Sequence, residues 1–158
     1  MRVAILTISD SVAAGKSQDR SGASVAARCR ELGWEIVSSG VRSDDRPAIE
    51  AFLKDTADSN QVDIILTTGG TGLGPRDVTP EATAAVVTRQ VPGLAELMRQ
   101  TGVQKTRNAA LSRAIAGVRG ECLIINLPGS PRGAVESFDA VAELLPHAVA
   151  VLHGVRHD

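Results

Sequence analysis

The stretch Thr-Thr-Gly-Gly-Thr-Gly-Leu-Gly-Pro-Arg-Asp-Val-Thr-Pro-Glu-Ala-Thr, residues 67–83, decides how the rest of this chain is interpreted. It follows residues 62–66, an apolar β-branched run that is typical of a buried strand. Glycine then recurs at four nearby positions: Gly69, Gly70, Gly72 and Gly74. Glycine costs backbone entropy and contributes no side chain to packing, so this run favours a loop that bends sharply and admits a ligand to its backbone.

The end of this stretch predicts the start of a helix. We expect Thr79 to be the N-cap, Pro80 to be the first helical residue and Glu81 to place a carboxylate in the first turn. This helix should run to about Arg89, before Pro92-Gly93. A strand, a glycine loop and a helix N-terminus in this order often hold phosphate. The loop lacks the lysine of the Walker motif and the glycine spacing of the dinucleotide motif. A long turn without a ligand is the alternative interpretation.

Composition narrows the classes of protein. The chain has 158 residues, enough for one domain over 1–158 with its own core, and a net charge of −1 that argues against binding nucleic acid or a membrane surface. No apolar run is long enough to span a membrane, and the N-terminus leads into a strand rather than a signal peptide. Cys29 and Cys122 lack metal-binding spacing, so we expect buried thiols in the cytoplasm.

Apolar strands alternate with helical stretches along the chain, which indicates an α/β fold. We expect a single three-layer domain, with a mainly parallel sheet and helices on both faces. The runs 114–118 and 122–127, split by Arg119-Gly120, predict a hairpin and therefore one antiparallel strand. The loops 67–83 and 126–133 should lie side by side at the carboxyl ends of their strands.

Several polar groups stand at predicted strand ends or helix starts. Ser9 and Asp10 follow the first strand, where an open α/β sheet binds its ligands. In the polar loop 13–21, Lys16, Asp19 and Arg20 could reach a phosphate or belong to a surface turn.

Charged residues elsewhere have simpler interpretations. Asp44 and Asp45 precede a helix, and such a pair usually supplies an N-cap and complements the helix dipole. Arg113, like Lys105 and Arg107, is expected to be a solvated charge.

His153 and His157 are four residues apart, but with no third ligand beside them we assign them no metal.

The glycine-rich stretch closely resembles the signature loop of the molybdenum-cofactor biosynthesis family. The matching elements are Gly-Gly-Thr-Gly at 69–72 and Asp-Val-Thr-Pro-Glu-Ala-Thr at 77–83. Further similarities are Ile-Ser-Asp at 8–10, Asp-x-x-Gly at 19–22, Leu-Ser-Arg at 111–113 and Leu-Pro-Gly-x-Pro at 127–131, so the resemblance covers nearly the whole chain.

The resemblance implies a function. Stand-alone family members of this length include molybdopterin adenylyltransferases, which use ATP and Mg²⁺ to attach AMP to the phosphate of molybdopterin. Larger molybdenum insertases contain the same domain with additional domains, which are absent here, so we expect the adenylyltransferase. The alternatives are a non-catalytic molybdopterin carrier, a nucleotide-binding sensor and a structural interaction domain.

The resemblance also implies the site. Asp77 and Asp44 would be catalytic and hold Mg²⁺, with Asp45 as the neighbour that the sequence does not separate from Asp44. Apart from the resemblance, the charge of Arg76 at the far end of the loop could contact a phosphate. The residues implied in binding molybdopterin and ATP are Ser9, Asp10, Thr68, Gly69, Gly70, Thr71, Gly72, Pro128, Gly129, Ser130 and Arg132.

The family usually forms trimers or trimer-based hexamers, so a homo-oligomer with cyclic symmetry is expected. Handover of the product to a molybdenum insertase is a further implied partnership.

Overall fold

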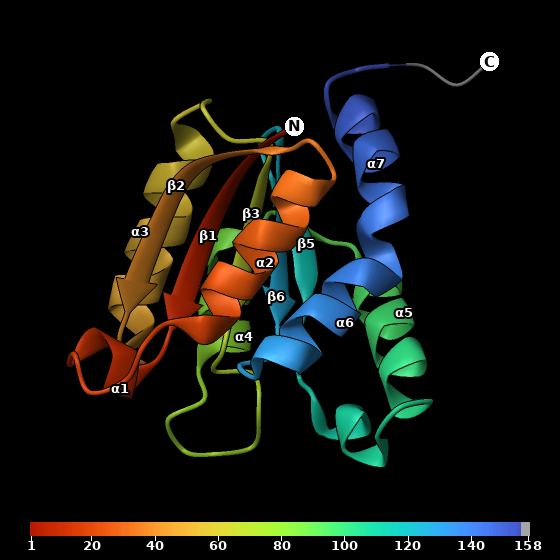
Figure 1. The fold of residues 1–158 in the computed structure, drawn as a ribbon. Helices are drawn as coiled ribbons and strands as arrows, with labels where there is room; N and C mark the ends of the chain where they lie inside the picture. Colours follow the sequence, from red (N-terminus) through yellow and green to blue (C-terminus); the bar gives the residue numbers. More distant parts are fainter. Residues whose placement is uncertain (156–158) are drawn as a thin grey trace.

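A single sheet with the strand order β2-β1-β3-β6-β5-β4 organises the computed structural model, which describes residues 1–155 (Figure 1). The strands are β1 (Arg2–Ile8), β2 (Glu35–Arg42), β3 (Ile64–Thr68), β4 (Arg89–Gln90), β5 (Ala116–Arg119) and β6 (Cys122–Leu127).

Strand directions confirm the predicted sheet. Strands β2, β1, β3 and β6 are parallel, β5 is antiparallel to β6, and β4 is antiparallel to β5. Within residues 1–155, β5 is therefore the strand that runs against the others. Gly120 makes the predicted hairpin turn with a φ of 58°, in the left-handed region that glycine adopts without strain.

The short strand β4 corrects one boundary. The sequence predicted a helix from Pro80 to about Arg89, whereas the helix ends at Val86 and the backbone of Val87 is extended. The Thr88 N–H donates to the carbonyl oxygen of Val118 over 2.8 Å, so pairing with β5 ends the helix.

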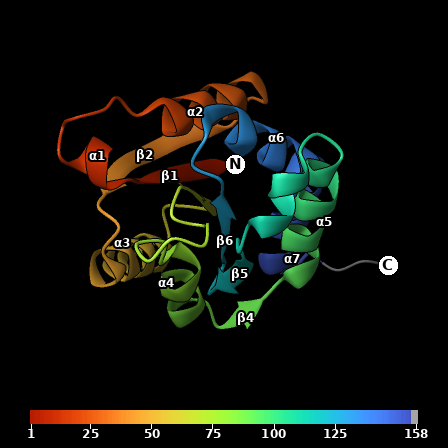
Figure 2. The same cartoon turned by 90° about the horizontal axis from the view of Figure 1, so that it is seen from below.

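Helices cover both faces of the sheet, as predicted (Figure 2). The face formed by Val3 and Ile5 packs against α2, α5, α6 and α7, and the face formed by Ala4 and Leu6 packs against α3 and α4. This division follows from the alternation of side chains along a strand.

None of the helices in the described range is long and apolar enough to cross a membrane. The helices are α1 (Asp10–Ala13), α2 (Arg20–Glu31), α3 (Arg46–Asp58), α4 (Thr79–Val86), α5 (Pro92–Val103), α6 (Pro131–Val141) and α7 (Leu145–Leu152), with 3₁₀ turns η1 (Arg107–Leu111) and η2 (Ala142–Leu144).

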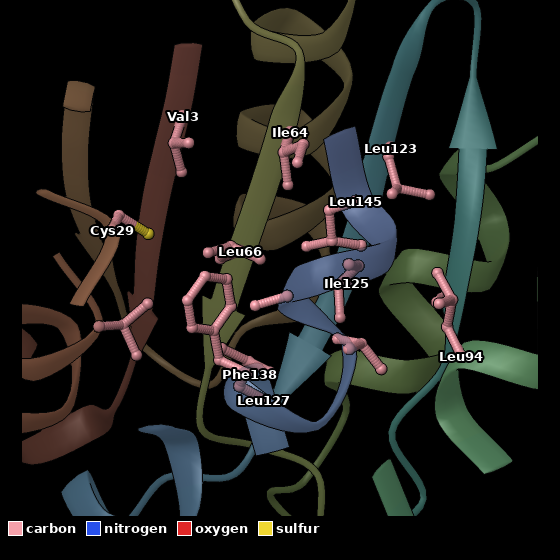
Figure 3. Close-up of a cluster of buried hydrophobic side chains, with 14 of the residues drawn as sticks. Val3, Cys29, Ile64, Leu66, Leu94, Leu123, Ile125, Leu127, Phe138 and Leu145 are labelled. Carbon is pink, nitrogen blue, oxygen red and sulfur yellow. The ribbon is translucent and has the colours of Figure 1, made fainter. Parts of the chain in front are cut away.

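The larger core is aliphatic around one aromatic pair. Figure 3 shows Phe138 from α6 beside Leu66, among side chains of the sheet. Phe138 is fully buried, and its ring meets Trp34 edge-to-face with 5.6 Å between ring centroids. Burial of these side chains fixes α2 and α6, whose N-terminal ends border the site described below.

The parallel pairing of β3 with β6 brings the two glycine loops together. Thr68 lies opposite Leu127 at the end of the ladder, and the Gly69 N–H donates to the Leu127 carbonyl oxygen over 3.0 Å. A Cβ atom at Gly129 would lie 3.3 Å from the Cα atom of Gly69. The predicted adjacency of the two loops is confirmed.

Candidate functional site

A cleft of about 370 Å³ lies where β1 and β3 end and where α2, α3 and α6 begin. The predicted residues that line it are Ser9, Asp44, Thr68, Gly69, Gly70, Asp77 and Gly129. They come from four separate segments of the sequence, and the carboxyl edge of the sheet brings them together.

Gly69 and Gly70 form the floor of the cleft, and no other residue suits either position. Their φ angles are 96° and 69°, in the left-handed region. A Cβ atom at Gly69 would collide with the carbonyl oxygen of Ile8, and one at Gly70 would collide with the Thr79 hydroxyl group. The absence of side chains therefore lets β1, β3 and α4 converge at this point.

Three successive amides of this loop lack a protein acceptor in the described part of the chain. Gly70 lines the cleft, whereas Gly72 and the buried Thr71 lie outside its lining. Within residues 1–155, the N–H groups of Gly70, Thr71 and Gly72 donate to no protein acceptor. Consecutive free N–H groups create a positive concavity that suits a phosphate oxygen.

Thr79 has a different role from the predicted one. The N-cap of α4 is Val78, which makes no side-chain cap, and Thr79 is already helical. The buried Thr79 hydroxyl group donates to the Gly69 carbonyl oxygen over 2.9 Å. Prediction of Thr79 as the cap was wrong because its hydroxyl group turns back to fasten the glycine loop.

The structure separates Asp44 from Asp45. Asp45 is the N-cap of α3, and its Oδ2 atom accepts a hydrogen bond from the Ala48 N–H over 3.1 Å. Asp44 lines the cleft, and its Oδ1 atom would lie 3.2 Å from a Cβ atom at Gly70. Asp44 is thus the carboxylate that faces the glycine loop.

Asp10 holds Asp44 in place. The Asp10 N–H donates to Asp44 Oδ2 over 3.1 Å, and the Asp44 N–H donates to Asp10 Oδ1 over 3.0 Å. Arg76 pairs with the same Asp10 carboxylate through Nε and Nη2, at 3.0 and 2.8 Å. These hydrogen bonds, those of Arg76 first, lower the pKa of Asp10. Asp10 and Arg76, expected to contact the ligand, therefore contact each other beside the cleft.

Asp77 has its carboxylate fixed by the backbone of its own loop. Its Oδ2 atom accepts a hydrogen bond from the Gly74 N–H over 2.8 Å and would lie 2.9 Å from a Cβ atom at Gly72 or Gly74. Glycine at these positions leaves room for the carboxylate, and no helix N–H group uses it as a cap.

The two cleft carboxylates act on each other. Burial raises the pKa of Asp44, and the negative charges of Asp10 and Asp77 raise it further. A cation placed between Asp44 and Asp77 would relieve this repulsion. Mg²⁺ prefers one or two carboxylates completed by phosphate oxygens and water, which this pair fits. No cluster of three or more metal-binding side chains occurs in the described part of the chain, so phosphate oxygens of a ligand would have to complete the coordination.

Other predicted loop residues have structural contacts. The Thr68 hydroxyl group lies 2.9 Å from that of Ser21, deep in the cleft. The carbonyl oxygens of Thr71 and Gly72 accept hydrogen bonds from Arg113.

The second glycine loop contributes less than expected. Ser130 caps α6 by accepting a hydrogen bond from the Gly133 N–H over 3.1 Å, and Pro128 lines a separate cavity of about 40 Å³. Arg132 is largely exposed and pairs with Glu136 four residues along its helix. The structure does not place these three side chains on the cleft with Asp44, although Gly129 lies there.

The start of α2 also lines the cleft. Arg20 lines the cleft, as does Asp19, whose carboxylate accepts hydrogen bonds from the Gly22 N–H and the Thr7 hydroxyl group over 2.9 and 2.7 Å. The polar loop before α2 is thus part of the site, and Arg20 supplies a cation there.

Sequence reasoning missed Arg113, which was expected to be solvated. It is only partly exposed and donates to the carbonyl oxygens of Gly72 and Asp77 over 2.7 and 2.8 Å, besides pairing with Glu81. Its place in Leu-Ser-Arg, an element that resembles the family, was the feature of the sequence that could have indicated its role.

His157, the second residue of the histidine pair, lies outside the described residues.

Comparison with known proteins gives consistent matches. The sequence pattern of the family described as "Probable molybdopterin binding domain" matches residues 4–147. A Helicobacter pylori molybdopterin adenylyltransferase is 38% identical over 98% of this chain and 89% of its own. The Escherichia coli protein of that name is 34% identical over 98% and 80%. The crystal structure of the molybdopterin biosynthesis enzyme MoaB from Thermus thermophilus matches with a TM-score of 0.92 and 48% identity, covering 99% of each chain.

The raised pKa of Asp44 predicts a stability effect with a defined pH dependence. A carboxyl group with a folded-state pKa above its unfolded value binds its proton more tightly in the folded protein, so its ionisation destabilises the fold as pH rises. Asp44→Asn should therefore increase the free energy of unfolding at pH 7, and this gain should shrink as pH falls toward the ordinary carboxyl pKa. Urea unfolding at both pH values measures it, and a loss of stability at pH 7 would contradict the assignment.

Proposed function

This chain belongs to the family of the probable molybdopterin binding domain, and on that premise we propose that it is a molybdopterin adenylyltransferase. It would transfer AMP from ATP to the phosphate of molybdopterin, with Mg²⁺, and release pyrophosphate. The observation that carries the proposal is the cleft in which Asp44 and Asp77 face a loop with free backbone N–H groups.

The reaction joins two anions. A phosphate oxygen of molybdopterin attacks the α-phosphorus of ATP, a new P–O bond forms, and the bond to the β-phosphate breaks. The attacking oxygen is already ionised near neutral pH, so no general base is required. Catalysis then depends on alignment and on neutralising charge where the phosphates meet.

The chain's own groups supply both requirements. The Gly70 N–H group lines the cleft and can bind a phosphate oxygen without reorganising, because Gly69 and the buried Thr79 hydroxyl group fix the loop. The N–H groups of Thr71 and Gly72, which have no acceptor within residues 1–155, follow it in the same loop. Asp44 and Asp77 would hold Mg²⁺, which stabilises negative charge on the phosphates when bound. Arg20, which lines the cleft at the start of α2, can pair with a further phosphate.

A molybdopterin carrier is the alternative within the same family. Binding alone would need the amide-lined loop, whereas two carboxylates beside it would repel a bound phosphate unless a cation neutralised them. The pair Asp44 and Asp77 therefore favours the enzyme.

Incubation with molybdopterin, ATP and Mg²⁺, followed by detection of adenylylated molybdopterin, tests the proposal. Molybdopterin binding without product would support the carrier.

We also propose that the protein is a cytoplasmic homo-oligomer, a trimer or hexamer, which hands its product to a molybdenum insertase. Exposed apolar side chains on the C-terminal segment, including Val151 and Val155, support an interface between copies. Light scattering at micromolar concentration should give a multiple of the 16.4 kDa chain mass, and a monomeric mass would contradict this proposal.

Asp77→Asn separates catalysis from binding. The amide keeps the size of the side chain and can still accept from the Gly74 N–H, but it loses the charge that would hold Mg²⁺. We expect AMP transfer to fall about 10²–10³-fold, the scale of one preorganised contact in a transition state. Molybdopterin binding should persist, because its donors are backbone N–H groups. Asp44→Asn should act in the same direction, and the double variant should lose less than the product of the two factors.

Asp45→Asn is the matched control for these variants. Asn caps a helix as well as Asp, so α3 should remain stable and transfer should stay near normal. Normal turnover in Asp77→Asn at saturating Mg²⁺ would contradict the catalytic assignment.

A further inference from the structure

We infer that Arg113 is a positioning residue that sets the place of the Asp77 carboxylate for metal binding. This inference rests on the proposed function and concerns a residue outside the cleft lining. Arg113 lies between η1 and β5, yet its hydrogen bonds go to the glycine loop some forty positions earlier in the chain.

The contacts of Arg113 enclose one segment of that loop. Its backbone N–H donates to the Thr71 carbonyl oxygen over 2.9 Å, and its Nε atom donates to that of Gly72 over 2.7 Å. Its Nη2 atom donates to the Asp77 carbonyl oxygen over 2.8 Å. One side chain thus holds both ends of segment 72–77.

This segment has little else to order it. Leu73 is 67% exposed, and residues 74–76 are exposed as well, so no apolar burial fixes them. Two glycines in the segment increase the backbone entropy that must be lost when it adopts one conformation. The contacts within the segment are the Gly74 N–H to Asp77 Oδ2 and the Asp77 N–H to the Gly74 carbonyl oxygen, at 2.8 and 3.0 Å. The other contact from outside the segment is the exposed ion pair of Arg76 with Asp10, which holds a side chain. Arg113 instead holds the backbone of the segment at Gly72 and at Asp77, and the position of Asp77 depends on these contacts.

Glu81 orients the guanidinium group from the other side. It pairs with Nη1, and this hydrogen bond lowers the pKa of Glu81. The planar guanidinium donates in three fixed directions at once, to Gly72, Asp77 and Glu81, which an ammonium group cannot reproduce. Glu81→Gln removes the ion pair but leaves both loop contacts in place.

Arg119 provides a control at the other end of α4. It pairs with Asp58 over 2.9 Å, and its Nη1 atom donates to the Val86 carbonyl oxygen over 2.9 Å. Arg119 thus resembles Arg113 in combining an ion pair with a backbone contact to α4, but its hydrogen bonds go to Asp58 and Val86 and not to segment 72–77.

The experiment compares Arg113→Gln, Arg113→Lys, Glu81→Gln and Arg119→Gln. Each variant is assayed for kcat, for KM of ATP, for the Mg²⁺ concentration that gives half the maximal rate, and for melting temperature. Arg113→Gln and Arg113→Lys should raise the half-maximal Mg²⁺ concentration about tenfold, the scale of a lost hydrogen bond to a charged group. Glu81→Gln should raise it less, and Arg119→Gln should lower only the melting temperature.

An unchanged Mg²⁺ dependence in both Arg113 variants would overturn the inference, because a purely structural role lowers stability alone. If the wild-type chain transfers no AMP, the proposed function fails, and hydrogen exchange then decides the role of Arg113 separately. Exchange of the Gly74 N–H should accelerate in Arg113→Gln and not in Arg119→Gln. Equal exchange in these two variants would overturn the inference on its own.

Discussion

The close approach of three backbone segments at Gly69 is the constraint on which the site depends. Its N–H group donates to Leu127, its carbonyl oxygen accepts from Thr79, and the Ile8 carbonyl oxygen occupies the place of a side chain. Any larger residue would push apart β1, β3 and the second glycine loop, which together build the floor of the cleft. The amide donors beyond Gly69 keep their direction because this junction is fixed.

The site places negative side chains where negative substrates would bind. Burial, together with the charges of Asp10 and Asp77, raises the pKa of Asp44, so the folded chain tolerates an unfavourable ionisation that an amide would remove. Both carboxylates are held by backbone contacts rather than by a cation: Asp44 by the Asp10 N–H, and Asp77 by the Gly74 N–H. The charges therefore remain available to a metal ion, which supports transfer between phosphates rather than simple storage of molybdopterin.

The sequence predicted the features that depend on local patterning. The alternating apolar runs predicted the layered α/β fold, and the turn at Arg119-Gly120 predicted the antiparallel strand. The glycine loop predicted the position of the cleft. The sequence could not assign separate roles to Asp44 and Asp45, because an aspartate at either position before α3 can cap the helix. The backbone conformation before α3 decides that Asp45 is the cap and that Asp44 lines the cleft. Arg113 and Arg132 could not be assigned, because the partners of a long charged side chain depend on distant segments. Arg113 contacts a loop some forty positions earlier in the chain, whereas Arg132 pairs with Glu136 in its own helix.

The position of the metal ion is the most direct test of the proposal that Asp44 and Asp77 bind it. Crystals grown with Mn²⁺ and a non-hydrolysable ATP analogue allow the ion to be located by its anomalous scattering, without dependence on turnover. We expect an ion coordinated by Asp44 and Asp77 together with phosphate oxygens of the nucleotide. An ion bound elsewhere, or a nucleotide bound in the cleft with neither carboxylate in contact with metal, would contradict it.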